Sequence, residues 1–136
     1  MADMYGKGKK GKATKLASKV VRTLGRCEKC GSPNYESLQS AHIIGRKYNA
    51  TRTMLRNQIC LCASCHAHFT DHPLEFANWV MISNLEQYTG TMSNLAKVPF
   101  KAKDAYWDMR IDFLNDMLNQ IDSGDFTLIE ARDYED

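Results

Sequence analysis

Two short stretches, Cys27-Glu-Lys-Cys30 and Cys62-Ala-Ser-Cys65, decide the fold that this chain can adopt. In each stretch two residues separate the cysteines, which lets both thiolates reach one ion from a tight turn. Four thiolates are the donor set of a structural Zn²⁺ site. The 31 residues between the two pairs exceed the spacing of a minimal zinc ribbon, so we expect the ion to close both ends of an insertion.

Cysteine usage also indicates the compartment. The fifth cysteine, Cys60, alternates with Leu61 just before the second pair, and we interpret it as a buried apolar side chain and not as a ligand. Thiolates at metal spacing are typical of a reducing compartment, so we expect a cytoplasmic protein. The sequence has no apolar run near the ~18 residues of a membrane span and no apolar signal region at its start, so no membrane partner is expected.

The charge is distributed unevenly along the 136 residues. Residues 1–70 carry thirteen Lys/Arg against three Asp/Glu, a net charge of +10, whereas residues 71–136 carry five against thirteen, a net charge of −8. A net charge of +10 on one half of the chain favours a polyanionic partner, and nucleic acid is the usual one. We therefore expect nucleic acid to bind the first half of the chain.

The length predicts one domain. The expected strands and helices place this domain in the α+β class, mainly helical, with flanking N- and C-terminal helices. Residues 1–13, rich in Gly and Lys, are predicted to form a basic disordered arm. The domain itself is expected over residues 14–121. Residues 122–136 are predicted to be an acidic tail that frays.

Apolar periodicity predicts the elements of this domain. We expect strands at 38–44 and 59–61, separated by a polar loop at 46–56. Three helices are expected: one at 14–24, one that begins near Ser64 and is interrupted by Pro73, and one at 101–121. Residues 84–99 are rich in turns and stay unassigned. The apolar stripe of the last helix is predicted to consist of Tyr106, Met109, Phe113, Met117 and Ile121.

Three polar residues of the insertion indicate its chemistry. His42 lies near the end of the first predicted strand, Asn57 at the end of the loop, and His66 in the first turn of the following helix. A neutral imidazole opposite a metal-binding imidazole, in a basic environment, meets the requirements of phosphodiester hydrolysis. The first imidazole takes a proton from water, and the metal stabilises charge on the phosphate.

A longer pattern surrounds these residues: Ala41-His-Ile-Ile-Gly-Arg46, then Thr51-Arg52, then Asn57, and nine residues later His66 in Leu61-Cys-Ala-Ser-Cys-His66. In this pattern residues 27–73 resemble the HNH family, the ββα-metal nucleases, and look closest to its small phage-type members. The resemblance implies a ββα-metal core closed by the four-cysteine zinc site. It also implies a metal-dependent endonuclease that hydrolyses DNA.

The resemblance implies a role for each matched residue. His42 matches the general base, His66 a ligand of the catalytic divalent cation (Mg²⁺, Mn²⁺ or Ni²⁺), and Asn57 the residue that orients the loop by hydrogen bonds. The structural Zn²⁺ belongs to Cys27, Cys30, Cys62 and Cys65. Two positions depart from the family pattern: Ala41 stands where a metal ligand is common, and Thr70, four residues after His66, is a weak ligand. Asp71, His68 and His72 are alternative ligands.

Cations of the basic half are expected to contact DNA phosphates. They are Lys7, Lys9, Lys10 and Lys12 in the arm, and Arg46, Lys47, Arg52 and Arg56 in the loop.

Several alternatives stay open at this point. A non-catalytic zinc module that binds nucleic acid would need the cysteines and the cations, and Ala41 favours it, whereas His42, Asn57 and His66 together favour a nuclease. A monomer would nick one strand, and a homodimer would cut both. If the chain is phage-encoded, it acts in the bacterial cytoplasm, beside phage packaging or recombination proteins.

Overall fold

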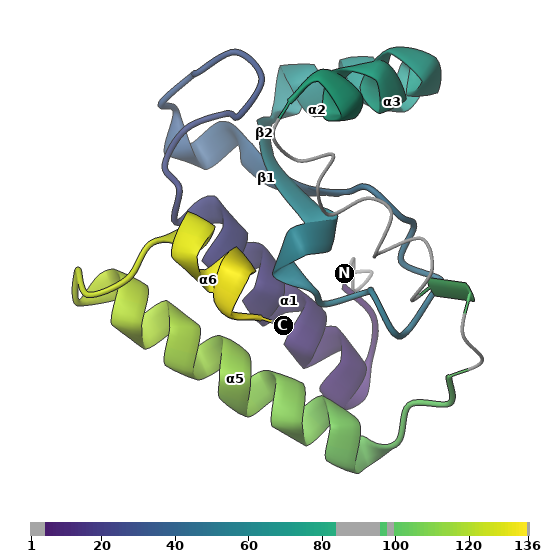
Figure 1. The fold of residues 1–136 in the computed structure, drawn as a ribbon, viewed down its shortest axis with the longest axis vertical. Coiled ribbons are helices and arrows are strands. Elements are labelled where there is room, and N and C mark those ends of the chain that lie inside the picture. The colour runs from purple at the N-terminus through teal and green to yellow at the C-terminus, as the bar shows by residue number, and fades with distance from the viewer. Residues whose placement is uncertain (1–4, 84–95, 98–99, 136) are drawn as a thin grey trace.

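The computed structural model describes residues 5–83, 96–97 and 100–135 (Figure 1). It is mixed α/β and mainly helical, as the sequence predicts. The elements are α1 (Gly8–Arg22), η1 (Tyr35–Ser37), β1 (Leu38–His42), η2 (Leu55–Asn57), β2 (Gln58–Cys62), α2 (Ala63–Asp71), α3 (Pro73–Ile82), α5 (Asp104–Asp122) and α6 (Leu128–Tyr134), of which η1 and η2 are single 3-10 turns.

The two strands form an antiparallel pair at the centre of the molecule. Ala41 lies opposite Ile59, and His42 lies opposite Gln58. Every residue of β2 is buried, because α1 packs on one face of the pair and α2 on the other (Figure 1). Helix α2 follows β2 without a loop, and the side chain of Cys62 caps its first turn by accepting the Cys65 N–H.

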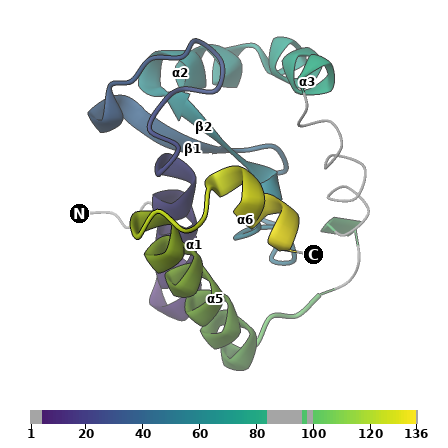
Figure 2. The same ribbon diagram turned by 60° about the vertical axis from the view of Figure 1, so that its left-hand side comes forward.

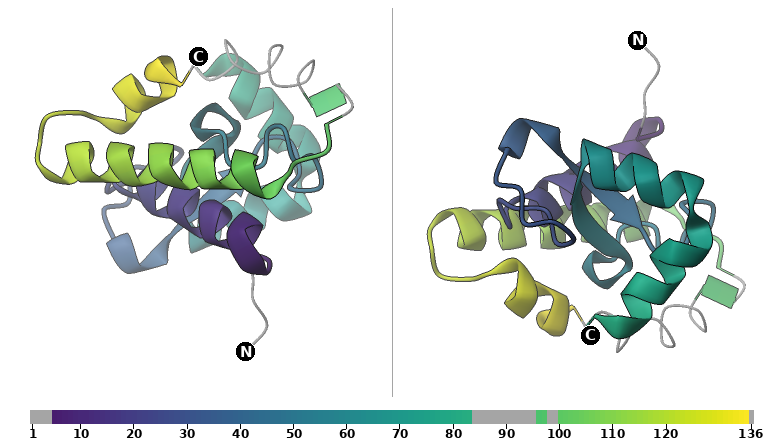
Figure 3. Two further views of the ribbon diagram at one scale, coloured as in Figure 1. Left: turned by 90° about the horizontal axis from the view of Figure 1, so that it is seen from below. Right: turned by 90° about the horizontal axis from the view of Figure 1, so that it is seen from above.

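The long helices α1 and α5 pack along each other beneath the sheet (Figure 3). Small residues of α1 permit this close approach, and Ala13 is buried against Trp107 and Ile111 of α5. A second, larger apolar cluster joins α1, both strands, α2 and α6, with Val20, Ile59 and Leu114 completely buried.

The predicted disordered arm is wrong from residue 8 onwards. Helix α1 begins at Gly8 and not at Thr14, whose hydroxyl donates to the carbonyl oxygen of Lys10 inside the helix. Gly11 is buried where the preceding chain crosses the helix, and a Cβ there would lie 2.0 Å from the carbonyl oxygen of Gly6. The Gly/Lys-rich segment is helical because its small residues let neighbouring chain pack against it.

The predicted fraying tail is also wrong, because residues 128–134 form α6. Thr127 caps this helix by accepting the Glu130 N–H. Leu128 and Ala131 are buried in the large apolar cluster, and Figure 2 shows α6 folded back toward the centre of the molecule. The folded unit therefore extends to Glu135, whose carboxylate is buried.

The buried face of α5 coincides with the predicted stripe at Met117 and includes Leu114, which lies beside that stripe, but it is otherwise turned toward Trp107 and Ile111. Trp107, Ile111, Leu114 and Met117 are buried, whereas the expected Met109 is 51% exposed. The aspartates of this helix are exposed, as predicted.

Residues 84–99, which the sequence leaves unassigned, lie outside the described residues except for 96–97. Within the described ranges, no helix has both the length and the apolar character needed to cross a bilayer.

Candidate functional site: a four-cysteine cluster and two histidines beside it

Four cysteine side chains meet where β2 passes into α2. Cys27 and Cys30 belong to the loop after α1, Cys62 ends β2, and Cys65 lies in the first turn of α2. The four sulfur atoms lie within 4.8 Å of one another, and Cys30 Sγ is 3.7 Å from Cys62 Sγ. Tetrahedral Zn–S bonds of about 2.3 Å separate sulfur atoms by about 3.8 Å, so the cluster could hold a metal ion such as zinc. The predicted convergence of these cysteines is confirmed.

Backbone N–H groups favour the thiolate form of Cys27, which is the form that a metal requires. The N–H groups of Cys30 and Cys65 point at the sulfur atoms of Cys27 and Cys62, each at 3.5 Å. Burial raises the pKa of the Cys27 thiol, but surrounding backbone N–H groups outweigh it and lower that pKa to about 7. Cys60 lies outside the cluster with 0% exposure, and burial raises its pKa to about 12. It is a buried thiol, as predicted.

Asn57 fixes the loop that joins the two strands. Its side chain is 0% exposed. Its Oδ1 accepts the Ile44 N–H at 2.8 Å, and its Nδ2 donates to the carbonyl oxygens of Ile44 at 2.9 Å and Thr51 at 3.1 Å. These bonds hold the end of β1 and the middle of the loop in one arrangement. They are contacts of the kind that the resemblance implies for Asn57.

His42 is a half-buried imidazole at the end of β1. Its Nε2 lies 2.8 Å from the carbonyl oxygen of Arg52. A carbonyl only accepts, so the neutral ring carries its proton on Nε2, and Nδ1 keeps a lone pair. Burial lowers the pKa of His42 to about 4, against the opposing effect of this hydrogen bond, and the charges of Arg46 and Arg52 add to the lowering. The ring is therefore neutral at physiological pH.

His66 lies in the first turn of α2 and contacts β1. Its Nδ1 is 2.6 Å from Oε1 of Gln39. Because an amide oxygen accepts, this bond puts the ring proton on Nδ1 and leaves the Nε2 lone pair for a cation. A carbonyl partner on the other ring nitrogen is how metal-binding histidines are oriented in proteins. Burial lowers the pKa of His66 and favours the same neutral form.

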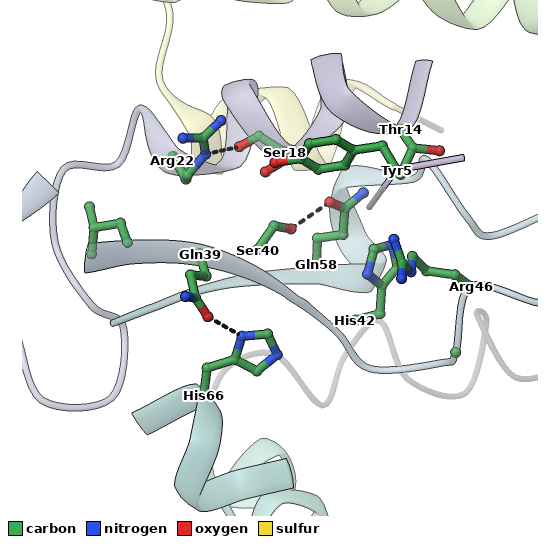
Figure 4. Close-up of a pocket in the computed structure, with 12 residues that line it drawn as sticks. Tyr5, Thr14, Ser18, Arg22, Gln39, Ser40, His42, Arg46, Gln58 and His66 are labelled. Carbon is green, nitrogen blue, oxygen red and sulfur yellow. Dashed lines mark hydrogen bonds between the residues drawn. The ribbon is translucent and has the colours of Figure 1, made fainter. Parts of the chain in front are cut away.

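A cavity of about 450 Å³ brings His42 and His66 to one place. Successive residues of a strand point to opposite faces, and Figure 4 shows Gln39 directed toward His66 and Ser40 directed toward Gln58 on the other side. In the described residues β1 pairs with β2 alone, so its outer edge stays open and both faces contribute to the cavity. Arg22 and Arg46 line the same cavity.

Two cations of the loop do not face solvent, which corrects their predicted phosphate contacts. Arg52 and Arg56 are each 9% exposed. Arg52 donates to Thr14 Oγ1 at 2.8 Å and to the carbonyl oxygens of Arg46 and Tyr5. Arg56 donates to the carbonyl oxygen of Arg132 at 2.8 Å. Both guanidinium groups join distant segments of the backbone, so neither is available to DNA.

The other predicted phosphate contacts lie at the surface of α1 and of the loop. Lys9 pairs with Asp108 at 3.0 Å, and both side chains are about half exposed. Lys47 lies over the ring of Tyr48, 5.0 Å from its centre. The exposed members of this set are Lys7, Lys9, Lys12, Arg46 and Lys47, and Lys10 is partly buried.

The residues that depart from the family pattern lie where a cation beside His66 would need ligands. Ala41 is on the same face of β1 as Gln39 and is 4% exposed. Thr70 donates its hydroxyl to the His66 carbonyl oxygen at 2.8 Å, and it lines a shallow groove with His66 and Asp71. Among the described residues, His66 is the one histidine that lines this shallow groove.

The sequence argument missed most residues of the cavity, among them Gln39 and Arg22. Gln39 could have been found from strand alternation, because it shares a face with Ala41 and precedes it by two residues. Arg22 is near the end of α1, and only the packing of α1 against β1 brings it to the cavity.

Comparison of the chain with protein-family models, curated proteins and solved structures finds no match. The resemblance to the HNH family therefore depends on the residues of the motif alone.

Proposed function

We propose that this protein is a metal-dependent endonuclease of the HNH type that hydrolyses phosphodiester bonds in DNA. One observation carries the proposal: the imidazoles of His42, at the end of β1, and His66, in the first turn of α2, line a single cavity together with two arginines. A domain that only bound DNA would need the cations, but it would not need a buried imidazole with an available ring nitrogen.

Each residue of the cavity would have its own role in the reaction. Arg22 and Arg46 would hold a phosphate of the DNA backbone in the cavity by charge-assisted hydrogen bonds. His42 Nδ1 would take a proton from a water molecule as its oxygen attacks phosphorus and the bond to the departing ribose oxygen breaks. The departing oxygen takes its proton from solvent, and the products are a phosphate monoester and a hydroxyl.

A divalent cation, when bound, would stabilise the charge that develops on the phosphate and on the departing oxygen. His66 Nε2 is the ligand that the chain offers it, and Thr70 or Asp71 would supply weaker oxygen donors. Water and substrate phosphate would complete the set. This incomplete donor set supports weak binding of the cation until DNA is present.

The low pKa of His42 has a consequence for the reaction. A base with a pKa of about 4 is deprotonated at pH 7 but accepts a proton weakly. An anionic phosphate in the cavity would favour the charged imidazole and raise this pKa, so binding of DNA would itself strengthen the base.

A second function, binding of nucleic acid by a non-catalytic zinc module, is favoured by Ala41. Its methyl group occupies a position on the His66 side of β1 where a carboxylate would complete the cation site. Both functions use the basic surface of α1, so binding of DNA alone does not distinguish them.

Cleavage of supercoiled plasmid in Mg²⁺, Mn²⁺ or Ni²⁺, with a chelator control, tests the proposal. We expect His42→Ala to lose at least about a hundredfold in rate, with zinc content and DNA affinity unchanged. His66→Ala is expected to lose activity through cation affinity and to recover in excess Mn²⁺, and Ala41→Asp to tighten cation binding.

A matched pair of arginine variants separates the cavity from the general surface. Arg22→Gln should slow cleavage, whereas Arg26→Gln, exposed and outside the cavity, should not. If the wild-type protein binds DNA but nicks no plasmid with any of these cations, the nuclease proposal is refuted and the non-catalytic zinc module is supported. Full nicking by His42→Ala would also refute the proposed mechanism.

A further inference from the structure

A second group of metal-ligand side chains lies at the corner between α2 and α3. His72 ends α2 and precedes Pro73, the first residue of α3, so it belongs to the joint between the helices. His68 precedes it by one helical turn, and Glu75 follows it in the first turn of α3. One ligand atom from each of these three residues lies within 4.8 Å of the other two.

The three side chains already contact one another. His68 Nε2 is 2.6 Å from Glu75 Oε2, and His72 Nδ1 is 4.0 Å from the same oxygen. The rings of His68 and His72 stack with their centres 4.3 Å apart. A bond of 2.9 Å between His72 Nδ1 and the His68 carbonyl oxygen keeps the second ring beside the first.

Two histidines four residues apart on one helical face are a zinc-binding arrangement. Two imidazoles and one carboxylate form the donor set of zinc sites that keep an open coordination position. Ligand atoms in a tetrahedral site with bonds of about 2.1 Å lie about 3.4 Å apart. The 2.6 Å between His68 Nε2 and Glu75 Oε2 is shorter than that value, and one ligand atom of each of the three side chains lies within 4.8 Å of the others. His72 Nδ1 donates to the His68 carbonyl oxygen, so the lone pair that His72 keeps for an ion is on Nε2. All three side chains are more than half exposed, so they can rotate to this distance without repacking the core.

This corner is separate from the cavity described above. His66 turns toward β1 and Gln39, whereas His68, two residues later on the same helix, turns toward α3. His68 and Glu75 line a different cavity, of about 510 Å³, together with Cys30 and Trp79. His68 and His72 therefore do not replace the missing ligands beside His66.

We propose that His68, His72 and Glu75 form a second metal site, which takes a divalent transition-metal ion such as Zn²⁺ and joins α2 to α3. Imidazole nitrogen is a preferred ligand of Zn²⁺, Ni²⁺ and Cu²⁺, whereas Mg²⁺ and Ca²⁺ prefer oxygen, so this site selects the first class. The ion replaces the hydrogen bond between His68 and Glu75. Because α2 also carries His66 and Cys65, an ion at this corner fixes the helix that supports both.

Zinc stoichiometry of the full chain tests this proposal. Protein with its four-cysteine site loaded is dialysed against increasing free Zn²⁺, and bound zinc is measured by mass spectrometry. We expect the wild type to reach two ions per chain. His68→Ala and Glu75→Gln should stop at one, and Asp112→Asn, which removes an exposed carboxylate from α5, should still reach two.

Cobalt spectra and ring resonances assign the second ion. The first equivalent of Co²⁺ should give thiolate charge-transfer bands, and the second should give visible bands without them. The imidazole resonances of His68 and His72 should shift with the second Zn²⁺ equivalent, and His66→Ala should keep the second ion. A wild type that saturates at one ion, or a Glu75→Gln variant that still reaches two, overturns the proposal. Neither result bears on plasmid cleavage, which tests the proposed nuclease separately.

Discussion

Replacement of Asn57 tests whether the loop between the strands depends on this one side chain. Asn57→Ala removes three hydrogen bonds of 2.8 Å, 2.9 Å and 3.1 Å from a residue with 0% exposure. It also leaves the N–H of Ile44 and the carbonyl oxygens of Ile44 and Thr51 without that partner. Each such bond contributes about 1 kcal/mol net, and a buried group left unpaired costs about 1–3 kcal/mol.

We expect Asn57→Ala to lower the free energy of unfolding by about 3–5 kcal/mol. A small domain has about 5–15 kcal/mol in total, so this loss is a large share. Asn57→Asp keeps an acceptor for the Ile44 N–H but turns an oxygen toward two carbonyl oxygens, and it should be nearly as harmful. The same loop provides the acceptor for His42, so both variants should also slow any cleavage without loss of zinc.

Asn49 provides the matched control in the same loop. Its Oδ1 is buried and has no hydrogen-bond partner within the described part of the chain. Removal of this unpaired oxygen by Asn49→Ala should leave stability unchanged or raise it slightly. Equilibrium unfolding in urea at one fixed concentration of free Zn²⁺ measures both variants, because bound metal adds to stability. If Asn57→Ala lies within about 1 kcal/mol of Asn49→Ala at an equal urea slope, the reasoning fails.

Three other predictions concern the cysteine cluster, His42 and the basic surface. Cys27→Ser should abolish folding or zinc binding, because metal binding in such sites contributes on the order of 10 kcal/mol to folding. Cys60→Ser should keep the zinc. Zinc analysis and circular dichroism measure both variants. His42 has a folded pKa of about 4 and an ordinary value of about 6.5, so the unfolded chain binds a proton between these values that the folded chain does not. Stability is lost as the pH falls through this window, and between pH 7 and pH 5 the wild type should lose about 2 kcal/mol more than His42→Gln in urea unfolding. Lys12→Gln on the exposed side of α1 should reduce the salt slope of DNA binding by about 0.9, and Lys103→Gln in the acidic half should leave that slope unchanged.

Local features of the sequence were sufficient to predict the two cysteine pairs of the cluster and the order of elements around them. Each cysteine pair lies within four residues, so the turn that brings two thiolates together is decided locally. The antiparallel strands follow from apolar residues on either side of a loop, and α2 follows directly from the second pair. The buried state of Cys60 was predictable for the same reason, because the apolar run that contains it is short and continuous.

The ends of the chain could not be predicted, because their structure depends on distant partners. Residues 8–13 have the composition of a disordered segment, and they are helical because α5 covers Ala13. Glu28 and Arg132, separated by 104 positions in the chain, form a partly buried ion pair at 2.9 Å. Arg110 and Glu135 form a second ion pair at 2.7 Å. Both pairs attach α6 to the core. Composition alone predicted an acidic tail for this segment, because it contains no information about these distant partners.

The loop cations show the same limit at the candidate site. The sequence shows that Arg46, Arg52 and Arg56 carry a charge. It does not show which guanidinium group donates a hydrogen bond to a carbonyl oxygen from another part of the chain. Folding buries Arg52 and Arg56 in such contacts and leaves Arg46 at the cavity. The spacing within each cysteine pair is local, so the sequence by itself indicated which side chains gather in the four-cysteine cluster. Only the tertiary structure decided which charges stay exposed, because burial of a charge depends on partners that come from elsewhere in the fold.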